Sequence, residues 1–168
     1  MITLSVAAIL AAIAAPSFSE MLREHRLTTR ANDFLAELQL ARSEAIRRGV
    51  QVTMLSDSGV ARVWEGGWTL FTDWDQDENH DNEDNENCAA ENLDCTLRVQ
   101  PPLTKGITIR SGGTYEDWMN FSPTGEVRGS GGFANGRFTL CIPGSRNGKI
   151  IILNLSGSAR VTDGDNAC

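Results

Sequence analysis

The chain has 168 residues, of which 40% are hydrophobic and 22% are charged, with 16 glycines and 5 prolines. This composition supports one folded domain of ordinary size and excludes a wholly disordered chain. The formal net charge of -7 argues against a general nucleic-acid-binding surface, because such surfaces are basic.

Residues 1–19 carry no charged side chain. A bilayer core is crossed by a helix of about 20 apolar residues, so this segment is predicted to span a membrane. No basic region precedes it and no turn follows it, so it does not resemble a cleaved signal peptide. The alternative is a buried core helix, which is disfavoured because a soluble domain rarely encloses an element that is apolar on every side.

The helical pattern continues past Pro16, where a kink is expected because proline removes one backbone hydrogen bond. Over residues 20–49 the apolar residues recur at steps of three and four, which places them on one helix face. These are Leu27, Ala31, Phe34, Leu38, Ala41 and Ala45. Charged residues, Glu37 among them, are expected elsewhere around the helix. Arg47, Arg48 and Gly49 form a stop signal, so one long amphipathic extension is predicted.

Residues 50–168 are predicted to form a β-rich globular domain, because short apolar runs alternate there with turn residues. Strands are expected at 50–55, 60–64, 67–71, 96–100, 107–110, 118–122, 137–142, 149–155 and 159–162. The run 60–64 is expected to return beside 50–55 as a hairpin. With no second long helix, the pattern indicates an α+β fold in which an antiparallel sheet packs on one helix.

An acidic loop lies between Asp73 and Asp94, with ten acidic residues and no Lys or Arg. Five oxygen-bearing residues fall at positions 1, 3, 5, 9 and 12 of an EF-hand-like frame. These are Asp75, Asp77, Asn79, Glu83 and Glu86. They form a candidate Ca²⁺ site, although the frame's glycine is replaced by His80. The alternative is a solvated loop without a cofactor.

The four cysteines, Cys88, Cys95, Cys141 and Cys168, show no CxxC spacing, so a zinc site is poorly supported. At least one disulfide is expected if the domain is exported, and buried thiols if it is not. Three pairings are open, of which Cys88–Cys95 with Cys141–Cys168 is the simplest.

Enzymatic function is not indicated. The sequence has no nucleophile-elbow pattern and no glycine-rich phosphate loop after a strand. His25 lies among charged helix residues and His80 in the acidic loop. Trp64 and Trp68 are expected in the core.

Several motifs resemble the GspH/FimT family of minor pilins and pseudopilins. They are Ala15-Pro16-Ser17-Phe18, the run from Leu38-Gln39 to Ala41-Arg42-Ser43-Glu44-Ala45, Phe121-Ser122-Pro123-Thr124-Gly125, and Leu140-Cys141. The resemblance implies a pilin-like fold, with segments 1–19 (transmembrane), 20–49 (periplasmic helix) and 50–168 (globular domain). Family members begin with a basic leader that a peptidase cleaves before methylating the new N-terminus. Met1 corresponds to a position inside the membrane helix, so the natural leader is expected upstream.

The resemblance also implies an assembly function. Such subunits wait in the bacterial inner membrane with the domain in the periplasm, and then join a type IV pilus or a type II secretion pseudopilus. Their partners are other pilins or pseudopilins and the inner-membrane assembly platform. The filament core would receive Ala7, Ala8, Ala11, Ala12, Pro16 and Phe18, because small residues allow close helix packing.

Some family members bind DNA for uptake through a Gly-Arg-X-Arg motif near the C-terminus. Here the matching segment is Gly157-Ser158-Ala159-Arg160, with one arginine missing. A DNA-binding patch of Arg160, Arg146, Lys149 and Arg137 is the alternative function, and ordinary surface charge is the simpler interpretation.

Overall fold

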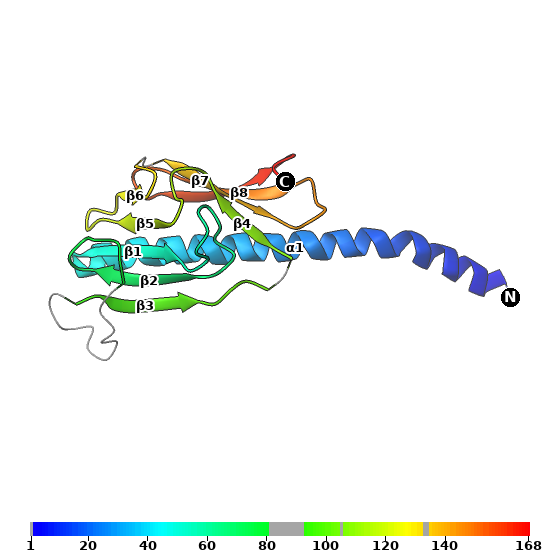
Figure 1. The fold of residues 1–168 in the computed structure, drawn as a ribbon. Coiled ribbons are helices and arrows are strands. Elements are labelled where there is room, and N and C mark those ends of the chain that lie inside the picture. The colour runs from blue at the N-terminus through cyan, green and yellow to red at the C-terminus, as the bar shows by residue number, and fades with distance from the viewer. Residues whose placement is uncertain (1, 81–92, 105, 133–134) are drawn as a thin grey trace.

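In the part of the chain that the structure describes, one long helix packs against two antiparallel sheets (Figure 1). The computed structural model describes residues 2–80, 93–104, 106–132 and 135–168, with side chains described from residue 18 onward, Ser19 excepted. Helix α1 (Ile2–Arg48) runs unbroken through Pro16. It ends at Gly49, whose φ of 70° lies in the left-handed region and whose amide donates to the carbonyl of Ala45 at 2.9 Å.

Among the described residues, nine strands form the two sheets, and every pairing between these strands is antiparallel. The five-stranded sheet, in the order β3-β2-β1-β5-β6, contains β1 (Gln51–Ser56), β2 (Trp68–Asp73), β3 (Cys95–Gln100), β5 (Trp118–Phe121) and β6 (Val127–Gly129). The four-stranded sheet, in the order β4-β7-β8-β9, contains β4 (Thr108–Ser111), β7 (Gly136–Cys141), β8 (Gly148–Leu153) and β9 (Ala159–Gly164).

The core lies where α1 meets strands of both sheets. All six apolar residues predicted on one helix face are buried. Phe34 occupies the junction, since its ring centroid lies 4.9 Å from that of Trp68 in β2 and 4.9 Å from that of Phe138 in β7. Edge-on aromatic contacts of this kind add to the free energy gained by burial. The same side chain therefore fastens the helix to each sheet.

The α+β prediction of one long helix on antiparallel β-structure is confirmed, but the strands form two sheets instead of one. The predicted hairpin strand 60–64 is wrong. β1 pairs with β2 and β5, and Val63 makes only an isolated bridge to Arg110. Hydroxyl groups of Ser56 and Ser58 each donate to the Val63 carbonyl at 2.7 Å, which holds this segment as a loop.

Glu37 departs from the sequence expectation because it is buried, with 7% of its surface exposed. Its Oε1 accepts from Nε of Arg98 in β3 at 2.8 Å. Burial raises the pKa of Glu37, against the opposing effect of Arg98. An ion pair thus links the helix to the edge strand β3.

Candidate functional site

The N-terminal half of α1 extends beyond both sheets (Figure 1). Along the described side chains of the helix, the buried core begins at Leu27. Before it, Phe18, Met21 and Leu22 are 63%, 57% and 43% exposed. Spacings of three and four residues place these three on one side of the helix. Contiguous exposed apolar side chains mark a surface that binds another apolar surface.

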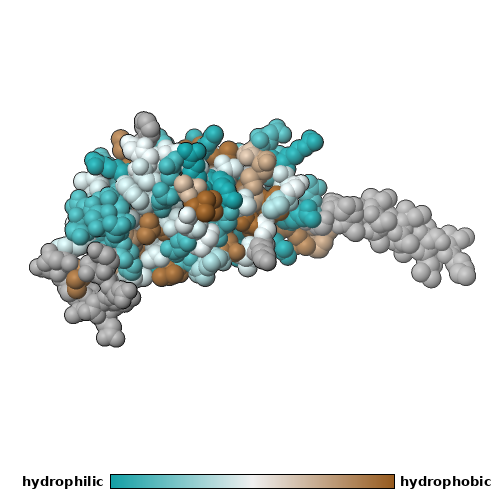
Figure 2. Space-filling model, viewed as in Figure 1, coloured by the Kyte–Doolittle hydropathy of each residue, from teal (hydrophilic) through white to brown (hydrophobic). Residues whose placement is uncertain are grey.

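The remaining residues predicted for the filament core, Ala7, Ala8, Ala11, Ala12 and Pro16, have side chains that lie outside the described part of the structure. Within that described part, no helix combines the length and apolar composition needed to cross a membrane. The viewed face of the globular domain shows small apolar areas scattered among polar ones (Figure 2).

The acidic loop begins where β2 ends. Of the five predicted calcium ligands, Asp75, Asp77 and Asn79 are exposed, while Glu83 and Glu86 lie outside the described residues. Asp77 is used locally, since its Oδ1 accepts from the Asn79 amide at 2.8 Å and its Oδ2 from Asn79 Nδ2 at 3.1 Å. These two bonds lower the pKa of Asp77, the side-chain bond first.

His80 turns back onto the sheet instead of facing the loop. Its ring centroid lies 4.8 Å from that of Phe71, and its Nε2 is 2.9 Å from Thr96 Oγ1. The described part of the EF-hand frame is therefore held by contacts within the loop and with β2 and β3.

A different trio of carboxylates comes together at the base of the loop. Asp73, Asp75 and Asp94 each offer an oxygen, and these atoms lie within 4.8 Å of one another. Asp73 and Asp94 are buried and Asp75 is exposed. The EF-hand frame missed Asp73 and Asp94 because they are far apart in sequence and meet only when β2 pairs with β3. The sequence signal that could have found them is the acid at each end of the loop.

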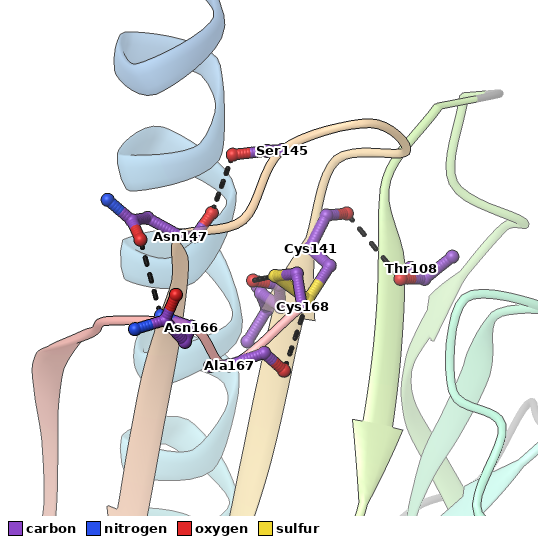
Figure 3. The surroundings of a disulfide bond; sticks show 8 residues. Thr108, Cys141, Ser145, Asn147, Asn166, Ala167 and Cys168 are labelled. Carbon is purple, nitrogen blue, oxygen red and sulfur yellow. Dashed lines mark hydrogen bonds between the residues drawn. A yellow bond between two sulfur atoms is a disulfide. The ribbon is translucent and has the colours of Figure 1, made fainter.

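The structure contains a disulfide between Cys141 and Cys168, so the expectation of at least one disulfide is confirmed. It joins β7 to the segment after β9 (Figure 3). Gly148 of β8 lies close to it, since a Cβ there would be 2.6 Å from Cys168 Sγ. The same end is held by the Cys168 amide, which donates to the Arg146 carbonyl at 3.2 Å. Cys95 is also disulfide-bonded. Its predicted partner, Cys88, lies outside the described residues.

The predicted basic patch is divided between the two faces of the four-stranded sheet. Lys149 forms an ion pair with Asp163 and lies 3.9 Å from Glu24 of α1, which places its ammonium on the helix side of the sheet. Arg160 pairs in register with Ile152, whose side chain points to the opposite face because neighbours along a strand alternate. Arg137 of β7 also pairs with Ile152, so it lies on the same face as Arg160. Arg146 lies in the exposed β7–β8 turn. DNA binding stays a prediction.

Residues 30–157 match the family of type II transport protein GspH. The chain belongs to this family. No curated protein sequence matches it. The match covers α1 from residue 30 onward and strands β1 to β8, so the family resemblance inferred from the sequence motifs is confirmed.

Solved structures agree with the fold of this GspH-family chain. The type IV minor pilin FimU of Pseudomonas aeruginosa (strain PAO1) is 18% identical in one crystal form, with a TM-score of 0.55 over 84% of this chain and 95% of FimU. A second crystal form of FimU gives 16% identity and a TM-score of 0.58, over 87% and 93% of the two chains. The minor pseudopilin EpsH from the type 2 secretion system of Vibrio cholerae is 15% identical, with a TM-score of 0.52 over 81% and 95%. The prediction of a structural pilin and not an enzyme is confirmed by this family membership.

Proposed function

We propose that this GspH-family protein is a minor subunit of a bacterial filament, and that the projecting half of α1 is the part that assembles. The observation that carries the proposal is the run of exposed Phe18, Met21 and Leu22 ahead of the point where α1 enters its own core. Apolar side chains on a free helix face lower their free energy by packing against another helix. Other pilins or pseudopilins would supply that helix.

The uncharged segment 1–19 extends the same surface in sequence. We propose that it holds the subunit in the inner membrane, with the globular domain in the periplasm, until the filament takes it up. An apolar helix can leave lipid only for an equally dry environment, such as a core of neighbouring helices. The Cys141–Cys168 disulfide supports a periplasmic domain, because disulfides persist in oxidising compartments.

The family match and the FimU and EpsH folds are compatible with either of two filaments. One is the pseudopilus of a type II secretion system, and the other is the type IV pilus. A strain lacking the gene separates them. Loss of protein secretion with normal pili assigns the subunit to the pseudopilus, whereas loss of surface pili with normal secretion assigns it to the pilus.

Substituting Phe18→Glu tests the assembling surface directly. A charge there opposes helix packing and apolar burial, so the amount of subunit recovered in sheared filaments is expected to fall by about tenfold or more. Immunoblots of filament and cell fractions measure it. The domain should keep its wild-type melting temperature, because Phe18 lies ahead of the core that begins at Leu27.

The matched control is Val60→Glu, which places the same charge at a residue that is 59% exposed in the loop between β1 and β2. This variant should assemble like the wild type. Wild-type recovery of Phe18→Glu in filaments would refute the proposed role of the projecting helix, as would finding the wild-type subunit dissolved in the cytosol.

A further inference from the structure

The trio of Asp73, Asp75 and Asp94 lies at the end of the domain remote from the projecting half of α1, where β2 ends and β3 begins (Figure 1). It is separate from the assembling surface. The three oxygens within 4.8 Å of one another belong to one strand end, one loop residue and the residue before the next strand. Three carboxylates at this spacing repel one another unless a cation or a proton lies between them.

The position of Asp73 is fixed by its own sheet. Its Oδ2 accepts from Thr53 Oγ1 at 2.6 Å and from Gln51 Nε2 at 2.8 Å, both on the neighbouring strand β1. The amide of Glu78 donates to the same oxygen at 3.3 Å. The two donors on β1 hold the carboxylate in one orientation, and the Glu78 amide adds a bond from the loop.

The other oxygen of Asp73 is the unusual one. Asp73 is 0% exposed, yet its Oδ1 has no hydrogen-bond partner within the described structure. Among the same residues, no Lys or Arg forms an ion pair with Asp73 or with Asp75. A buried carboxylate oxygen without a partner is costly, and such an atom calls for a ligand that supplies positive charge.

The groups beside Asp73 also show that this part of the domain is strongly negative. Asp94 Oδ1 accepts from the Trp74 amide at 3.0 Å, which fixes the second buried carboxylate beside the first. Burial raises the pKa of Glu78, and the charges of Asp73, Asp77 and Asp75 raise it further. The trio is therefore placed by two strand ends in strongly negative surroundings, and Oδ1 of its buried member Asp73 has no hydrogen-bond partner in the described structure.

We propose that Asp73, Asp75 and Asp94 bind one divalent cation, with calcium as the preferred ion. Hard oxygen ligands suit Ca²⁺, which takes them at about 2.3–2.6 Å, so two ligands of one ion are at most about 5 Å apart. The spacing of the trio satisfies this limit without movement. Magnesium takes ligands at about 2.1 Å in strict octahedral geometry, which would require the three carboxylates to close in.

Calcium binding is tested on the full-length protein in detergent, stripped of metal with EDTA and titrated with CaCl₂ in a calorimeter. One ion per chain is expected, with a Kd of about 1 mM or below. At about 100 times the Kd, calcium should raise the melting temperature by about 5–10 °C, and MgCl₂ by less. No heat and no change in melting temperature at about 10 mM CaCl₂ would overturn the proposal.

Two variants that each remove one negative charge distinguish calcium binding at the trio from general attraction of calcium to the acidic loop. Asp75→Asn should weaken calcium binding by about tenfold or more, because it removes a direct ligand. Asp77→Asn, an exposed acid outside the trio, should change the Kd by less than about threefold. An equal loss in both variants would show diffuse attraction to the loop and refute the site.

A third variant, Asp73→Asn, removes the buried charge. It is expected to abolish the calcium response while keeping at least the wild-type melting temperature in EDTA, because the amide retains an oxygen for Thr53. A wild-type calcium response in this variant would equally refute the proposal.

Discussion

Arg42 in α1 connects the helix to two turns of the globular domain. Its Nε donates to the carbonyl of Gly125 at 3.1 Å. Gly157 lies against the same pair, since a Cβ at that position would be 2.1 Å from the Gly125 oxygen and 2.8 Å from Arg42 Nε. The glycine of the segment 157–160 therefore has a packing role, whether or not Arg160 contacts DNA.

Gly157→Ala is expected to lower the free energy of unfolding by about 2–4 kcal/mol, as measured by urea denaturation. It combines a left-handed backbone, φ +71°, with a clash against a backbone oxygen. Gly144→Ala is the control, because Gly144 has φ +83° but no atom within 4 Å of its Cβ position. Gly144→Ala should lower the free energy of unfolding by only about 1 kcal/mol. Equal losses would show that the contact with Gly125 is unimportant.

At the scale of elements, the four-stranded sheet is closed at one end by a covalent link. Cys141 of β7 and Cys168 after β9 are 27 residues apart in sequence, and β8 lies between their strands. Linking residues at this separation restricts the unfolded chain. Asn147 in the β7–β8 turn adds a weaker tie, because its Oδ1 accepts from the Asn166 amide at 3.3 Å (Figure 3).

Replacing both Cys141 and Cys168 by Ser should lower the free energy of unfolding by about 3–4 kcal/mol, the loss expected from the closed loop. Urea denaturation under non-reducing conditions measures it. Asn147→Ala removes the hydrogen bond to the Asn166 amide at the same end of the sheet but keeps the disulfide. It should lower the free energy of unfolding by about 1 kcal/mol. If the double-serine variant loses no more free energy of unfolding than Asn147→Ala, the assigned role of the disulfide is contradicted.

At the scale of the whole molecule, the core needs only the second half of α1. Buried helix residues start at Leu27, and the two sheets close around Phe34. A variant lacking residues 1–25 should therefore fold, with a melting temperature within about 3 °C of the full chain, as calorimetry can test.

Deleting residues 1–35 instead removes Leu27 and Phe34 together. Each large core side chain is worth about 2–5 kcal/mol, so this variant should lose most or all of its stability. If the shorter deletion unfolds the domain as well, the division of α1 at Leu27 is incorrect.

The sequence predicted those features that depend on local periodicity. The apolar face from Leu27 to Ala45 was evident from its spacing, and eight of the nine strands were anticipated within a few residues. Strand β6 was missed because three residues carry no alternation, and the hairpin at 60–64 failed because strand partners are chosen by long-range pairing. The carboxylate trio escaped for the same reason, since Asp73 and Asp94 meet only across β2 and β3.

The position of Phe34 determines how the subunit responds to tension. A pull on the N-terminal end of α1 acts along the helix axis and reaches both sheets at once, through the rings of Trp68 and Phe138. The force acts parallel to the contacts that Phe34 makes with Trp68 and Phe138, so these contacts must break together instead of one by one. In the proposed filament, this domain would therefore resist separation from its own helix, because the contacts of Phe34 with both sheets must break together.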